Sequence, residues 1–151
     1  MALNPEFAGR VYPPSAPYLV GREKIREFAD AIGDRNPAYH HVDAARALGH
    51  ADLVAPPTFA IVMATRASSA VIHDPELGLD YSRVVHGEQG FAYVRPILAG
   101  DELVVTTTIE SIRTMAGNDM ITTRGDIATL EGEPVATATS LIVSRAPEDT
   151  A

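Results

Sequence analysis

The hydrophobic pattern of the chain changes near its middle from helical spacing to strand alternation. In the first half, apolar residues recur at i, i+3, i+4 and i+7, at Ile25, Phe28, Ala29 and Ile32. This spacing predicts a helix from residue 22 that ends at Gly33, since glycine commonly follows the last turn of a helix. A short second helix, over residues 43–48, is predicted before Gly49.

The longest unbroken apolar stretch covers residues 59–72 and directly follows Pro56, Pro57 and Thr58. Thr58 is a good N-cap residue, and no glycine or proline interrupts the stretch. Its apolar side chains point in too many directions for a surface stripe, so we expect a helix that is buried on most sides. Arg66 and two serines make the stretch too polar to cross a bilayer. The first backbone N–H groups of such a helix have no internal partner and are suited to bind an oxyanion.

Strand features dominate the second half, where β-branched residues alternate along the chain. Strands are predicted over residues 82–97, 102–114, 120–130 and 135–145, with a short one at 18–20. Turn residues at 99–101, 116–119 and 131–134 predict hairpin connections between them. Helices followed by hairpin-linked strands indicate an α+β domain in which one antiparallel sheet packs on a long helix.

Composition narrows the class of protein further. The chain has 151 residues, 46% of them apolar, which predicts one domain over residues 1–151. It has no cysteine, which excludes disulfides and cysteine-ligated metals. The net charge of −8 argues against nucleic acid as the main partner. We expect a cytoplasmic protein without a membrane span, because no basic and apolar leader opens the sequence.

Three motifs resemble those of the MaoC-like hotdog-fold hydratases and dehydratases. They are Gly33-Asp34-x-Asn36-Pro37, the proline-rich start of the apolar helix, and Arg95-Pro96-Ile97-x-Ala99-Gly100-Asp101. The likeness covers nearly the whole chain and points to the N-terminal MaoC-like dehydratase branch, which includes accessory subunits of (3R)-hydroxyacyl-ACP dehydratases. The resemblance implies a single hotdog fold, with an antiparallel sheet around one long helix, two hotdogs paired side by side, and an acyl tunnel near their interface. No metal or other cofactor is expected.

The catalytic members carry Gly-Asp-x-Asn-Pro-x-His, and their Asp and His form the dyad. Asp34 and Asn36 match this motif, but Tyr39 stands in the place of the histidine, and His40 and His41 follow it. Dehydration of a 3-hydroxyacyl thioester needs a base with a pKa near neutral, which imidazole supplies and a phenol, with a pKa of about 10, does not. The resemblance therefore implies Asp34, with His40 or His41, as the catalytic candidates.

A second departure from the family lies at Pro56, which aligns with a glycine whose N–H binds the thioester oxygen. Proline has no N–H, so Thr58 or Phe59 would have to supply the donor. Substrate-binding candidates are Asn36, Tyr39, Pro57, Thr58, Phe59, His86, Gly87 and Gln89.

Each candidate also has a purely structural interpretation. Asp34 and Asn36 suit turns, Tyr39 suits core packing, and the segment at His86 suits a polar strand edge. His50 is interpreted as a surface residue.

Two classes of function follow from the resemblance. In the first, the chain binds the acyl chain of an acyl-ACP or acyl-CoA thioester, as a homodimer or as a heterodimer with a second MaoC-like subunit that holds an intact dyad. In the second, it is a self-sufficient homodimeric (R)-specific enoyl hydratase that uses Asp34 with His40 or His41. A hotdog thioesterase is a weaker alternative, because residues 56–73 contain no carboxylate before Asp74.

Overall fold

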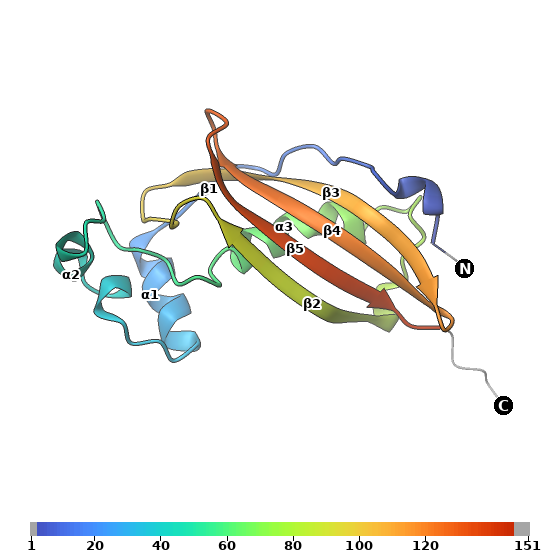
Figure 1. Ribbon diagram of the computed structural model, residues 1–151, viewed down its shortest axis with the longest axis horizontal. Coiled ribbons are helices and arrows are strands. Elements are labelled where there is room, and N and C mark those ends of the chain that lie inside the picture. Colours follow the sequence, from blue (N-terminus) through green and yellow to red (C-terminus); the bar gives the residue numbers. More distant parts are fainter. Residues whose placement is uncertain (1–2, 147–151) are drawn as a thin grey trace.

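The strand-forming half of the chain builds one curled antiparallel sheet (Figure 1). The computed structural model describes residues 3–146, and the strand order in the sheet is β1-β3-β4-β5-β2. The strands are β1 (Tyr18–Leu19), β2 (Val84–Tyr93), β3 (Glu102–Met115), β4 (Asn118–Thr129) and β5 (Pro134–Ser144). The α+β class and the hotdog arrangement expected from the sequence are confirmed.

Two of the three predicted hairpins are present, and one prediction is wrong. β3 pairs with β4 and β4 with β5, as tight turns at 116–117 and 130–133 allow. The break at 99–101 does not join neighbours, because β2 pairs with β5 and lies at the opposite edge of the sheet from β1. The segment between β2 and β3 therefore crosses the end of the sheet.

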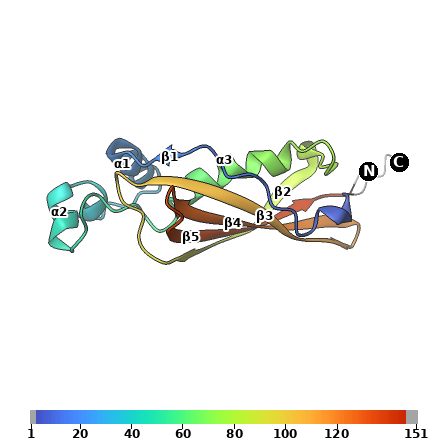
Figure 2. The ribbon, with the colours of Figure 1, turned by 90° about the horizontal axis from the view of Figure 1, so that it is seen from above.

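Three α-helices accompany the sheet: α1 (Arg22–Ala31), α2 (Val42–Ala47) and α3 (Ile61–Ile72). Short 3₁₀ turns cover Pro5–Phe7, Pro37–Tyr39 and Tyr81–Arg83. α1 buries Ile25 and Ala29 as its spacing predicts, and Gly33 beyond it has a φ of 73°, which glycine adopts without strain. α1 and α2 lie beyond one end of the sheet, while α3 rests on the concave face (Figures 1 and 2).

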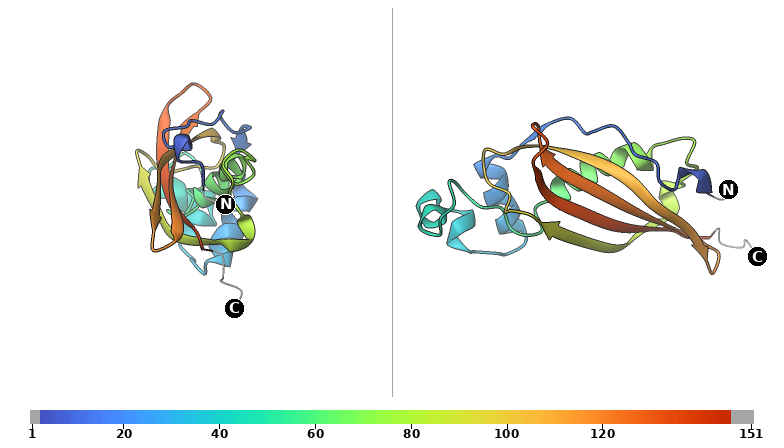
Figure 3. Two further views of the ribbon diagram at one scale, coloured as in Figure 1. Left: turned by 90° about the vertical axis from the view of Figure 1, so that its right-hand side faces the viewer. Right: turned by 45° about the horizontal axis from the view of Figure 1, so that its top comes forward.

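α3 differs in two ways from its sequence-based prediction. It starts at Ile61 rather than at residue 59, because residues 57–60 form a turn, and no side chain caps its first residue. Its buried residues, Met63, Ala67 and Val71, follow one another every four positions and form a single stripe. The expectation of burial on most sides is wrong, since the sheet covers one side of the helix (Figure 3). Arg66, on another side, is exposed.

An N-terminal strap, residues 9–20, covers the edge of β3 that β4 leaves free. The N–H groups of Gly9, Tyr12 and Ser15 donate to carbonyls of β3 over distances of 2.7–2.9 Å, and the strap ends in β1. The Tyr12 hydroxyl donates to Asp74, just past α3, over 2.9 Å. β2 has no such cover among the described residues and is left as the long open edge of the sheet.

None of the described helices is long and apolar enough to span a membrane.

Candidate functional site

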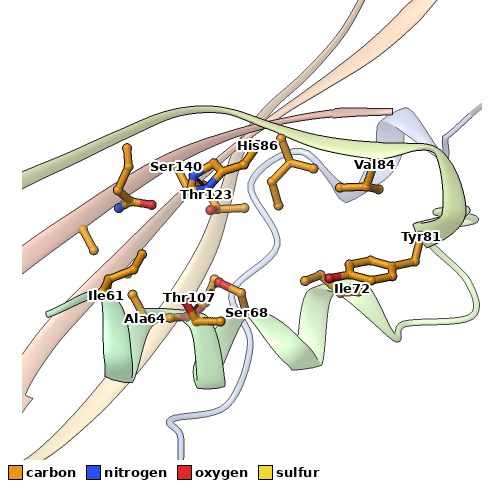
Figure 4. Close-up of a pocket in the computed structure, with 15 residues that line it drawn as sticks. Ile61, Ala64, Ser68, Ile72, Tyr81, Val84, His86, Thr107, Thr123 and Ser140 are labelled. Atoms are coloured by element: carbon orange, nitrogen blue, oxygen red, sulfur yellow. Dashed lines mark hydrogen bonds between the residues drawn. The ribbon is translucent and has the colours of Figure 1, made fainter. Parts of the chain in front are cut away.

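A cavity of about 160 Å³ lies between α3 and the concave face of the sheet (Figure 4). One face of α3 and residues from β2, β3, β4 and β5 line it. Small residues keep the space open, because Ala64 of α3 lines it together with Gly125 and Ala138 of the sheet. Both apolar and polar side chains line the cavity.

A β-bulge at Gly87 turns both His86 and Gln89 toward this cavity. In a regular strand, residues three apart point to opposite faces. The register of β2 against β5 shifts between His86 and Glu88, which leaves Gly87 as the extra residue. A Cβ on Gly87 would lie 3.4 Å from Leu141, in ordinary contact. Of these three sequence-predicted residues, His86 and Gln89 line the cavity and Gly87 sets their direction.

A second hollow, of about 280 Å³, lies beside the end of β2 and brings together residues far apart in the sequence. Three of its lining residues, Asn36, Tyr39 and Pro57, are substrate-binding candidates. His50, interpreted from the sequence as a surface residue, lines the same hollow and is only partly exposed. Its proximity to Tyr39 depends on how the chain folds back after α2, which no local pattern reveals.

The motif around Asp34 forms a tight turn. The Asp34 carboxylate accepts the Asn36 N–H over 3.1 Å, and the Asn36 side-chain oxygen accepts the Ala38 N–H over 3.0 Å. These bonds hold the 3₁₀ turn that places Tyr39 in the core, where the side chain is 9% exposed. Burial, together with the negative charge of Asp34, raises the pKa of Tyr39 above its ordinary value. A raised pKa leaves even less of the phenol as phenolate at neutral pH, so less of it is in the form that can accept a proton.

The two candidate histidines point elsewhere. His40 Nε2 lies 3.2 Å from the backbone oxygen of Asp34 and 3.8 Å from a carboxylate oxygen of Asp30. His41 is exposed and directly precedes α2. Neither histidine lines the hollow that holds Tyr39.

Tyr93 was not among the residues predicted from the sequence, and its side chain contacts the turn that precedes α3. Its hydroxyl donates to the Pro57 carbonyl over 2.5 Å. Burial raises the pKa of Tyr93, and the Ala60 N–H acts in the opposite direction. The alternation of side chains along β2 would have indicated that Tyr93 points toward the helix.

The two residues proposed to replace the missing donor at Pro56 lie in different environments. The Phe59 N–H donates to the Pro56 carbonyl over 2.9 Å, and its ring is fully buried, 5.4 Å from the ring of Phe28 between centroids. Thr58 is exposed. The Phe59 amide is therefore already paired, which leaves Thr58 as the accessible candidate.

Comparison with known proteins gives consistent matches. The family described as FAS1-like, dehydratase domain region, matches residues 6–138. A UPF0336 protein of Streptomyces griseus is 58% identical over 149 residues, which cover 99% of both chains. A UPF0336 protein of Saccharopolyspora erythraea is 54% identical and covers 96% of this chain and 93% of its own.

Two solved structures are similar in both fold and sequence. A MaoC-like dehydratase superposes with a TM-score of 0.86 at 35% identity, covering 94% of this chain. This chain spans 43% of the length of that protein. The truncated HadBC (3R-hydroxyacyl-ACP dehydratase) complex from Mycobacterium tuberculosis gives a TM-score of 0.81 at 32% identity and covers 91% of this chain and 96% of its own.

Proposed function

The chain belongs to the family described as FAS1-like, dehydratase domain region, and from that premise we propose that it is a subunit of a 3-hydroxyacyl-thioester dehydratase or hydratase. In this role the cavity beneath α3 holds the acyl chain of an ACP or CoA thioester. A second MaoC-like subunit supplies the Asp and His dyad. In this role the chain is a single hotdog domain and lies in the cytoplasm, as expected from the sequence.

The observation that carries the proposal is the side chain at the dyad position. Tyr39 is buried, its pKa is raised, and the Asp34 carboxylate next to it is engaged in a turn. General base catalysis at neutral pH needs a group whose pKa lies near that pH. Tyr39 does not meet this requirement, which favours a role in binding over a role in proton transfer.

The open edge of β2 supports a partner of the same fold. A long strand with unpaired backbone groups is a template for pairing with another strand, and soluble proteins cover such edges. The similar M. tuberculosis dehydratase is itself a complex. We infer that β2 is where this chain meets its partner, either a second copy or a second MaoC-like subunit.

The alternative is a self-sufficient homodimeric hydratase, and one contact favours it. His40 Nε2 lies 3.2 Å from the backbone oxygen of Asp34, so an imidazole is next to the residue that carries the candidate carboxylate. The thioesterase alternative has less support, because α3 carries no carboxylate.

The test is an assay of 3-hydroxyacyl-thioester dehydration by the purified chain and by the chain together with the proteins that co-purify from its native host. We expect turnover with the partner and none without it. His40→Ala and His41→Ala should leave the complex active. Turnover by the chain alone that is abolished by either substitution would make it an enzyme in its own right.

A further inference from the structure

Polar side chains from four neighbouring strands gather on the concave face of the sheet beneath α3, although Thr123 itself pairs with the apolar Ile109 of β3. Gln89 of β2 pairs directly with Ser140 of β5, and Ser140 pairs with Thr123 of β4. Thr107 of β3 lies in the next row, and the His86 ring nitrogen Nε2 lies 3.1 Å from the Ser140 hydroxyl. All five residues line the cavity, and Figure 4 shows His86, Ser140 and Thr123 gathered on its sheet side. We call these five residues the polar row.

Apolar rows lie on both sides of the polar row. On one side Val105 pairs with Ile127, and on the other Ile121 pairs with Ile142. These two pairs belong to separate clusters of the hydrophobic core. The polar row thus interrupts the core at the position of the cavity.

The two threonines of the row are buried without a protein partner. Thr107 is 4% exposed and Thr123 is 3% exposed, and within residues 3–146 neither hydroxyl forms a hydrogen bond to the protein. No fully enclosed side-chain oxygen is left unpaired in this part of the chain, so both hydroxyls open onto the cavity. A buried hydroxyl that stays unpaired is destabilising, because it has lost its hydrogen bonds to water. Valine has nearly the same shape as threonine and has no hydroxyl, so it would suit a cavity that binds only saturated hydrocarbon better than threonine does.

We propose that the cavity binds acyl chains that carry a further oxygen substituent, a hydroxyl or keto group on a carbon beyond the 3-hydroxyl that a dehydratase removes, and that the polar row recognises this oxygen. The inference rests on the proposed acyl-binding function and adds the substrate class. Threonine and serine hydroxyls both donate and accept, and Gln89 retains an amide N–H beyond the one it gives to the Gly90 carbonyl. These groups can pair with a keto oxygen as well as with a hydroxyl.

Space for the substituent lies next to the row. Gly125 pairs with both Thr107 and Ala138. Gly125 and Ala138 are small, and both line the cavity. A Cβ on Gly125 would lie 3.1 Å from Val105, so even alanine at this position would press on the neighbouring strand. A site that hydrogen-bonds a substrate oxygen rejects the analogue that lacks it, because its own polar groups are then left unpaired.

The experiment measures binding rather than turnover, because the cavity lies between one chain's own helix and sheet. Isothermal titration of the full chain compares acyl-pantetheine thioesters of one chain length, one saturated and the others with a ketone at successive carbons. We expect at least one keto isomer to bind about tenfold more tightly than the saturated chain, the effect of one net hydrogen bond.

Matched variants assign this preference to the polar row. Thr123→Val should abolish it, whereas Thr122→Val, on the opposite face of the same strand, should retain it. Ser140→Ala provides a second test of the row if Thr123→Val does not fold, as judged from the melting temperature.

The outcomes separate the inference from the proposed function. If the saturated thioester binds as tightly as every keto isomer, and Thr123→Val increases its affinity, the assigned substrate class is wrong. Acyl binding by the cavity then still stands. If no thioester binds, the proposed function fails and the inference fails with it.

Discussion

At the scale of single residues, Asp34 holds a turn at the position where the sequence resemblance places a catalytic carboxylate. Its side chain holds the turn through the Asn36 N–H, and its charge helps to raise the pKa of Tyr39. These two effects are separable, because asparagine retains the hydrogen-bond acceptor and removes the charge.

We expect Asp34→Asn to lower the pKa of Tyr39, since a negative charge near a phenol disfavours the phenolate and its removal relieves that effect. Burial, the larger cause, will still hold this pKa above the ordinary value of 10.0. The free energy of unfolding should hardly change in Asp34→Asn, whereas Asp34→Ala should lower it by about 1 kcal/mol. Ultraviolet titration of the phenols, with Tyr39→Phe as the control, checks the first statement. An identical titration curve in Asp34→Asn would contradict it.

Ala60 and Ala64 allow a matched test of the cavity. Ala64 lines it, while Ala60 is fully buried in the core and does not. Ala64→Leu should therefore restrict binding to shorter acyl chains and leave the free energy of unfolding nearly unchanged. Ala60→Leu should destabilise the fold by about 1–3 kcal/mol through overpacking. Calorimetric binding of a chain-length series and urea unfolding distinguish the two effects, and equal effects of both substitutions on chain length would refute this assignment.

At the scale of elements, the N-terminal strap is fastened to the end of α3 by a titratable contact. The Tyr12 hydroxyl donates to Asp74, and Arg10 lies 4.3 Å from the centre of the Phe7 ring. Burial, followed by the hydrogen bond and charge of Asp74, raises the pKa of Tyr12 from 10.0 to about 12. The strap is therefore held by the neutral form of Tyr12.

We predict a loss of stability at alkaline pH that Tyr12→Phe removes. Because the folded-state pKa is the higher one, the stabilisation is complete below pH 10 and is lost as the pH rises toward 12. The free energy of unfolding of the native chain should fall more steeply over this window than that of Tyr12→Phe. Urea unfolding at a series of pH values measures both slopes. Tyr81, which is exposed, provides the control, and Tyr81→Phe should follow the native chain.

Local patterns predicted the elements better than their arrangement. The helical spacing at Ile25 and Ala29 predicted α1, and β-branched alternation predicted β3, because each depends on neighbours along the chain. The place of β2 at the far edge depends on pairing with β5, some fifty residues later, which no local pattern contains.

The candidate site was predictable to a similar extent. His86 and Gln89 were found by family resemblance, whereas their shared direction depends on the bulge at Gly87. The polar row appears only when the strand register is known, because Thr123 and Ser140 are neighbours across strands and not along the chain.

At the scale of the whole molecule, the open edge of β2 predicts association. The chain should sediment as a dimer or larger assembly at micromolar concentration, with no monomer. Val85 lies on this strand and is 42% exposed, so Val85→Asp should weaken the assembly by placing like charges together. Met115→Asp, at an exposed position on the β3–β4 hairpin, is the control and should not. A stable monomer of the native chain would defeat the prediction.

The strap over β3 has a consequence for how copies of the chain can add to one another. A sheet that offers two free edges can be extended without limit, as a polymer grows from a unit with two reactive ends. With its other edge occupied by residues 9–20 of its own chain, this sheet resembles a unit with one reactive end, and each pairing through β2 terminates growth. Homodimer and heterodimer would then compete for the same edge, so the supply of a second subunit would decide how many self-paired copies remain.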